Sequence, residues 1–154
     1  MKRAITAFEV DAEGDPVARL ACGHRQHVRH DPPLAERPWV LTPEGREARI
    51  GTPLDCVRCD RLEMPDGFAP YRRTPEMDQA STPKALRGVH TTKAGVWGRI
   101  LVFEGALDYE LLAPFDRRER LTPERSGTIP PEVPHRVSPA GTVRFVVEFW
   151  KAGS

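Results

Sequence analysis

Apolar and polar residues alternate most clearly in the second half of the chain. Residues 99–104 alternate with a period of two, which is typical of a strand with one buried face. Gly105 then predicts a tight turn into a second strand, residues 106–112. Residues 143–150 are mostly β-branched and aromatic, and they give the strongest strand signal in the chain. The pattern therefore predicts a β-sheet in this half.

The first part of the chain predicts a smaller β unit. Ile5–Val10 and Val17–Cys22 flank a turn-forming cluster at 11–15, so we expect a β-hairpin here. Further on, Thr42 is a suitable N-cap and Pro43 suits the first helical position, which predicts one helical turn.

Between residues 64 and 83 the periodicity disappears, and prolines and polar residues dominate. This composition is typical of a linker or of an extended lead-in strand. We place a domain boundary near Gly67, which gives domains at 1–66 and 67–154. The charged stretch 116–124 is interpreted as a solvated hairpin tip.

Composition narrows both the fold class and the function. The chain has 154 residues, enough for one ordinary domain or two small ones. Sixteen prolines and twelve glycines favour short strands over long helices, so we expect an all-β protein. A net charge of +1 gives no basic field that attracts nucleic acid. No apolar run approaches the ~18 residues that a membrane span needs.

The expected compartment follows from the first residues and from the cysteines. The N-terminal segment lacks the apolar stretch of a signal peptide, because Glu9 interrupts it. We therefore expect a cytoplasmic protein. In that compartment three cysteines are not expected to form a disulfide framework.

A cysteine and histidine cluster predicts a metal site in the first domain. Cys22 and His24 are two residues apart at the end of a predicted strand, which puts both side chains on one face. Cys56 and Cys59 have the spacing that lets two thiolates of one turn face the same ion. Structural zinc is bound tetrahedrally by four such side chains, so the set predicts a structural zinc site in a zinc-ribbon-like β unit.

Two questions about this cluster stay open at the level of sequence. His27 and His30 compete with His24 for the fourth position. The alternative without a metal treats the cysteines as small buried hydrophobic residues and the histidines as a solvated polar face.

The first 63 residues resemble a small bacterial family of uncharacterised domains. The resemblance is specific, but it implies no function, because none is assigned to that family. It rests on a CGHxQHVRH-type stretch, a Pro-Trp pair, a Glu-Gly-Arg triplet and a final CxxC followed by Asp-Arg, which here are Cys22–His30, Pro38–Trp39, Glu44–Arg46 and Cys56–Arg61.

From about Tyr71 to Trp150 the chain resembles the cupin-like domain of the tellurite-resistance protein B family. The resemblance implies a cupin or jelly-roll β-barrel and, by analogy with cupins, a homodimer. Some family members carry a methyltransferase after this domain, but we do not expect methyl transfer here, because the chain has no glycine-rich cofactor loop. The residues that carry the resemblance are His90, Thr92, Lys93, Gly95, Trp97, Gly98, Val102, Gly105, Leu107, 131–135, Phe149 and Trp150.

His90 and His135 are the candidate ligands of a divalent metal in the barrel pocket. The first precedes a predicted strand and the second follows a proline-rich turn. Imidazole suits several metals, so the pair does not name one. Gly98 stands where an ordinary cupin has a glutamate ligand, and Glu148 replaces it only if its side chain points inward. The alternative is a pair of hydrogen-bonded polar residues at the barrel mouth, without metal.

Trp97 and Trp150 are expected in the core, and Arg99 on a solvated strand face. The resemblance to the tellurite-resistance protein B family implies a non-catalytic stress-response protein that binds a small molecule or an oxyanion in its cupin pocket. One alternative is a small metal-dependent cupin enzyme, a hydrolase, isomerase or dioxygenase. A second alternative is a zinc module that docks a protein partner.

Overall fold

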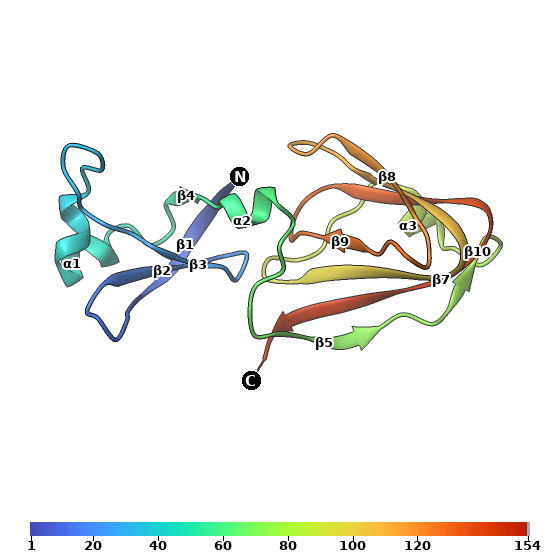
Figure 1. The fold of residues 1–154 in the computed structure, drawn as a ribbon, viewed down its shortest axis with the longest axis horizontal. Helices are drawn as coiled ribbons and strands as arrows, with labels where there is room; N and C mark the ends of the chain where they lie inside the picture. The colour runs from blue at the N-terminus through green and yellow to red at the C-terminus, as the bar shows by residue number, and fades with distance from the viewer. Residues whose placement is uncertain (154) are drawn as a thin grey trace. The chain divides into compact units, whose positions relative to one another are not determined.

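The computed structural model describes residues 1–153, and β-strands dominate both of its parts (Figure 1). The predicted all-β class is confirmed in outline, because the chain is mostly β-strand with a few short helices. The chain forms two compact units, Met1–Arg58 and the part from Cys59 onward. The domain limits 1–66 and 67–154 stay a prediction.

The first unit contains a four-stranded sheet built on the predicted hairpin. Its strands lie in the order β3-β2-β1-β4, and the pairs are antiparallel. The hairpin turn is stabilised by Asp11, whose carboxylate accepts the backbone N–H groups of Glu13 and Asp15 at 3.0 and 2.8 Å. The strands are β1 (Lys2–Val10), β2 (Pro16–Leu20), β3 (Arg25–His27) and β4 (Pro53–Asp55).

Two short helices, η1 (Pro38–Leu41) and α1 (Pro43–Glu47), lie between β3 and β4 in the chain. A third, α2 (Val57–Asp60), follows β4 and includes the boundary between the two units. The predicted cap is confirmed, because the hydroxyl of Thr42 accepts the N–H of Gly45 at 3.0 Å. Within residues 1–153, no helix has both the length and the apolar character needed to cross a membrane.

The second unit is an antiparallel sheet in which two long strands lie side by side (Figure 1). Its main order is β5-β10-β7-β8, with β6 paired to β10 and β9 paired to β7. The elements are β5 (Phe68–Arg73), β6 (Met77–Asp78), α3 (Lys84–Arg87), β7 (Trp97–Leu111), β8 (Arg117–Leu121), β9 (Gly127–Ile129) and β10 (His135–Ala152).

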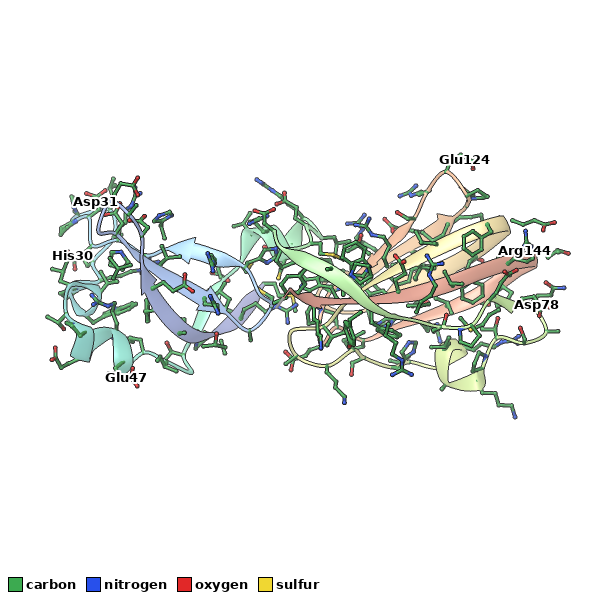
Figure 2. The ribbon with its side chains drawn as sticks, turned by 90° about the horizontal axis from the view of Figure 1, so that it is seen from below. His30, Asp31, Glu47, Asp78, Glu124 and Arg144 are labelled. Atoms are coloured by element: carbon green, nitrogen blue, oxygen red, sulfur yellow. The ribbon has the colours of Figure 1, made fainter. Side chains whose placement is uncertain are left out.

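Ion pairs across the strands fix the register at one end of this sheet. Arg144 of β10 lies opposite Asp78 of β6, and Figure 2 shows the two side chains near each other. The Arg144 guanidinium donates to Glu104 and to Glu76 at 2.8 and 2.7 Å. These carboxylates raise the pKa of Arg144. Buried between the strands are Trp97, Ile100, Leu107, Tyr109, Leu111, Leu121 and Phe145.

The predicted tight turn at Gly105 is wrong. β7 continues through this residue as one strand, and the irregular pairing opposite it lies between Pro139 and Val143. Gly105 has a φ of +78°, and a Cβ there would lie 1.8 Å from the carbonyl oxygen of Thr142. The glycine therefore marks a bulge, where the two backbones approach more closely than any side chain allows.

The predicted hairpin tip at 116–124 is also wrong for most of its length. Residues 117–121 form β8 and pair with β7. Arg117, Arg118 and Arg120 are exposed, so this stretch is solvated as expected, but it is a strand and not a tip, and Leu121 at its end is fully buried. The arginines are held by carboxylates on the same sheet, as in the pair between Arg120 and Asp108 at 3.0 Å.

Candidate metal centre and candidate ligand cavity

Cys22 and His24 lie on a tight turn that follows β2. The turn is closed by two backbone hydrogen bonds, from Gly23 N–H to the Leu20 carbonyl at 2.8 Å and from Leu20 N–H to the His24 carbonyl at 3.0 Å. Gly23 has a φ of +95°, a conformation that favours glycine. Because the chain reverses here, Cys22 and His24 point into the same buried space, with relative exposures of 0% and 1%.

Cys56 and Cys59 come from the segment after β4. The N–H of Cys56 donates to the carbonyl of Met1 at 2.7 Å, which holds this segment beside β1. The next residues form the single turn of α2, and this turn places Cys59 beside Cys56. Both side chains are buried.

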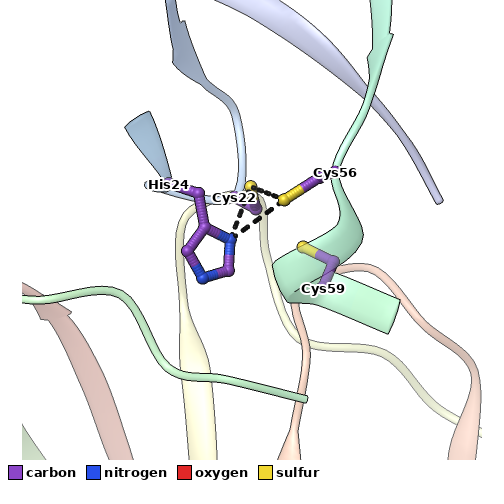
Figure 3. A group of neighbouring side chains, drawn as sticks. All are labelled: Cys22, His24, Cys56 and Cys59. Carbon is purple, nitrogen blue, oxygen red and sulfur yellow. Dashed lines mark hydrogen bonds between the residues drawn. The ribbon is translucent and has the colours of Figure 1, made fainter. Parts of the chain in front are cut away.

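The four side chains form one compact cluster (Figure 3). His24 Nδ1 lies 3.3 Å from the Cys22 sulfur and 3.2 Å from the Cys56 sulfur, and the two sulfurs are 3.9 Å apart. All four ligand atoms lie within 4.8 Å of one another. Tetrahedral zinc with its usual bond lengths separates such atoms by roughly 3.5–3.8 Å. The cluster therefore has the size of a metal site.

The other two histidines of the first unit, His27 and His30, form hydrogen bonds away from the cluster. His27 is exposed, and its Nε2 lies 2.8 Å from the carboxylate of Asp11. This hydrogen bond lowers the pKa of Asp11. His30 accepts the backbone N–H of Arg37 through Nδ1 at 2.9 Å. The structure thus brings His24, and not these two, to the cysteines.

A cavity of about 270 Å³ in the second unit brings His90 and His135 together. The two imidazole rings meet edge to face, with their centroids 4.2 Å apart. The Nδ1 of His90 lies 2.9 Å from the Gly88 carbonyl, and the Nδ1 of His135 lies 2.9 Å from the Val133 carbonyl. A carbonyl accepts only, so each Nδ1 carries the proton and donates it.

His135 is held in its neutral form. The residue is 1% exposed and lines the cavity. Its pKa is lowered to about 4, mainly by burial; the hydrogen bond to Val133 raises the pKa and the nearby His90 lowers it. Burial also raises the pKa of Tyr109, whose ring packs against that of His135 with centroids 6.2 Å apart.

No carboxylate joins this pair among the residues that line the cavity. Glu148 forms an ion pair with Arg73 at 2.8 Å, and its neighbours Val147 and Phe149 line the cavity in its place. At Gly98, a Cβ would lie 2.8 Å from Cδ1 of Ile129, so the isoleucine occupies the space of a longer side chain. Within residues 1–153, the one group of three or more metal-binding side chains is the Cys22 cluster. The expected barrel metal is therefore not supported.

The expectation of a solvated Arg99 holds only in part, because the residue is half-buried and does not line the cavity. Its Nε is buried, and its guanidinium lies 5.2 Å from the ring centroid of Trp150. Trp97 is fully buried, as expected. Sequence reasoning missed Arg72, which lines the cavity from β5 and lies over the ring of Phe149. The lead-in segment has no periodicity, so no sequence signal pointed to this residue.

Each half of the chain matches a different family. Residues 6–63 match the model of a family described as "Protein of unknown function (DUF3565)". Residues 72–147 match the model of the TehB-like domain. These matches agree with the two resemblances found in the sequence, although they do not single out the histidine-rich stretch 22–30. No curated protein sequence matches the chain.

Two solved structures are similar to part of the chain. TehB from Haemophilus influenzae shares 23% identity with a TM-score of 0.53, and the match covers 56% of this chain and 32% of that one. This chain thus spans about a third of the length of that relative. A protein from E. coli strain K12 shares 24% identity with a TM-score of 0.54, over 60% of this chain and 98% of that one. These likenesses show the fold alone.

Proposed function

We propose that this chain is a non-catalytic binding protein of the tellurite-resistance type. A structural zinc ion ties the turn at 22–24 to the segment 56–59, and a cupin-type barrel binds a small molecule or an oxyanion in its cavity. The proposal rests on the match of residues 72–147 to the TehB-like domain together with the cavity at His90 and His135.

The zinc part of the proposal is carried by the donor set Cys22, His24, Cys56 and Cys59. Four protein ligands close a structural site, whereas a catalytic zinc keeps one position open for water. All four side chains are buried, so they leave no such position exposed to solvent. A unit this small has little apolar core, and metal binding supplies folding free energy that burial does not.

The binding part of the proposal is carried by the lining of the cavity. Arg72 and Lys93 contribute positive charge, and the two histidines contribute polar ring nitrogens. Apolar side chains make up most of the remaining wall. A concave, mostly apolar site with a few convergent polar groups is the usual form of a small-molecule pocket.

Metal analysis of the purified protein tests the zinc part of the proposal. We expect one zinc per chain in the wild type, full retention in the double variant His90→Ala/His135→Ala, and loss in Cys56→Ala/Cys59→Ala. Retention of zinc in the cysteine variant would contradict the structural site. A second metal that is lost only with the histidines would instead favour the metal-dependent enzyme.

A further inference from the structure

The two histidines of the cavity present hydrogen-bond acceptors to whatever fills it. Each Nδ1 donates its proton to a backbone carbonyl, Gly88 for His90 and Val133 for His135. In the neutral ring the second nitrogen, Nε2, then carries a lone pair. None of the described residues donates a hydrogen bond to either Nε2. The residue His135 is almost fully buried, so its Nε2 is left to accept a hydrogen bond from a group inside the cavity that it lines.

The rest of the lining separates an apolar wall from a cationic mouth. Ile100, Ile129, Val137, Val147 and Phe149 form the wall. The exposed side chains of Arg72 and Lys93 carry the positive charge, and no aspartate or glutamate is present in the lining. The cavity thus combines apolar surface, two acceptors and two cations.

This combination does not suit an inorganic oxyanion. Such an ion has no apolar part to cover the wall, and its removal from water is costly without paired donors. Its oxygens would also face the lone pairs of the two Nε2 atoms. A ligand that fits must bring an O–H donor to Nε2, an oxygen acceptor to the cations and an apolar body to the wall.

We propose that the cavity binds a small organic acid with an apolar chain. The acid O–H donates to the Nε2 of His135, the second carboxyl oxygen accepts from Lys93 or Arg72, and the chain packs against the apolar wall. This inference rests on the proposed binding function of the same cavity. Because the acid is ionised in neutral solution, binding takes up one proton from solvent.

The other titratable or charged groups near the pair do not supply that proton. Tyr109, behind the His135 ring, is buried and neutral. Glu132, which precedes His135 in the chain, is exposed and is not in the lining. The remaining groups in the lining are Tyr71, Arg72 and Lys93.

Isothermal titration calorimetry on the full zinc-loaded chain tests the inference with butanoate, hexanoate and octanoate. Each added methylene buries apolar surface, so the affinity should rise about fourfold per methylene until the cavity is full. Repeating the hexanoate titration in two buffers of different ionisation enthalpy should give close to one proton taken up per ligand. Inorganic phosphate and methyl hexanoate serve as probes that lack the chain and the acid proton, and both should bind more weakly than hexanoate.

A matched pair of variants tests whether hexanoate binds at His135. His135→Phe keeps a buried ring but removes the acceptor, so hexanoate should bind roughly 3- to 10-fold more weakly and without proton uptake. His27→Gln changes an exposed histidine of the other unit and should leave hexanoate binding unchanged. If His135→Phe does not fold, the chain-length series and the proton count on the wild type still decide the question.

The outcomes separate this inference from the proposed function. Phosphate binding that is lost on changing His135, with no gain from longer acids, would overturn the organic acid and leave the binding pocket standing. Absence of binding by every probe would overturn both. Affinity that rises with chain length but with no proton uptake would overturn the role of the histidines.

Discussion

The backbones of His90 and His135 form an isolated antiparallel bridge. Each amide N–H donates to the carbonyl of the other residue, at 3.0 and 2.9 Å. The bridge joins the loop before β7 to the start of β10, so it holds the two imidazole rings against each other whatever the side chains themselves contribute. The adjacency of the two rings is therefore a consequence of backbone pairing, although only His135 is buried and His90 is half-buried.

This burial predicts a pH dependence of stability. The folded-state pKa of His135 is about 4, below its ordinary value of 6.5, so the unfolded chain binds the proton more readily between these values. The contribution is fully present above pH 6.5 and is lost as the pH falls towards 4. We expect a loss of up to about 3 kcal/mol of unfolding free energy across this window.

Urea unfolding of the wild type and of His135→Gln at pH 7, 6 and 5 measures this effect. Glutamine does not titrate, so the stability difference between the two proteins should shrink as the pH falls. Any effect of acid on the metal cluster is common to both proteins and cancels in the difference. A difference that stays constant with pH would contradict the prediction.

The bulge at Gly105 predicts a large effect of a single methyl group. Gly105 and Gly141 both have a φ of +78°, but a Cβ at Gly141 meets nothing within 4 Å. Gly141→Ala should therefore cost only the left-handed conformation, about 1–2 kcal/mol. Gly105→Ala adds the collision with the Thr142 carbonyl and should cost at least about 3 kcal/mol or prevent folding. Thermal unfolding of the pair checks the contrast, and equal losses would rule out the close approach.

The packing of Gly98 against Ile129 gives a second steric prediction. An added Cβ would lie 2.8 Å from Cδ1 and 3.0 Å from Cβ of the isoleucine. Gly98→Ala alone should cost about 1–3 kcal/mol, as overpacking does. Ile129→Val removes Cδ1, so the double variant should recover part of that loss. A double-mutant cycle on urea unfolding measures the coupling, and simple additivity would show that the two residues do not compete for space.

The candidate metal cluster could be predicted largely from sequence because its ligands are local. The CxxC spacing and the Cys-x-His pair each place two side chains together through a single turn. The choice of His24 over His27 could not be made in that way. It depends on where the chain reverses: His24 lies on the turn before β3, whereas His27 ends β3 and is exposed beside Asp11.

The second unit was harder to predict because its features depend on long-range register. A glycine at a bulge and a glycine at a turn look the same in sequence, so β7 was divided at Gly105. The charged stretch 117–121 looked like a loop because nothing in its own sequence shows its pairing with β7. The sequence also did not show which face of β10 lines the cavity. The pairing of β10 with β7 decides this, and Val147 points into the cavity.

The choice between His24 and His27 leads to a prediction for zinc binding. Both histidines lie in the same short segment, but His24 is in the cluster and His27 is exposed beside Asp11. Loss of a residue that only hydrogen-bonds to a metal ligand weakens metal binding by about 10- to 100-fold. Loss of a direct ligand in His24→Ala should therefore weaken zinc binding by more than about 100-fold. At a fixed zinc concentration this corresponds to at least about 2.7 kcal/mol of lost stability. Competition with a chromogenic chelator measures the affinity, and thermal unfolding with and without chelator measures the stability. His27→Ala should bind zinc as the wild type does; equal weakening in the two variants would mean that His24 is not the fourth ligand.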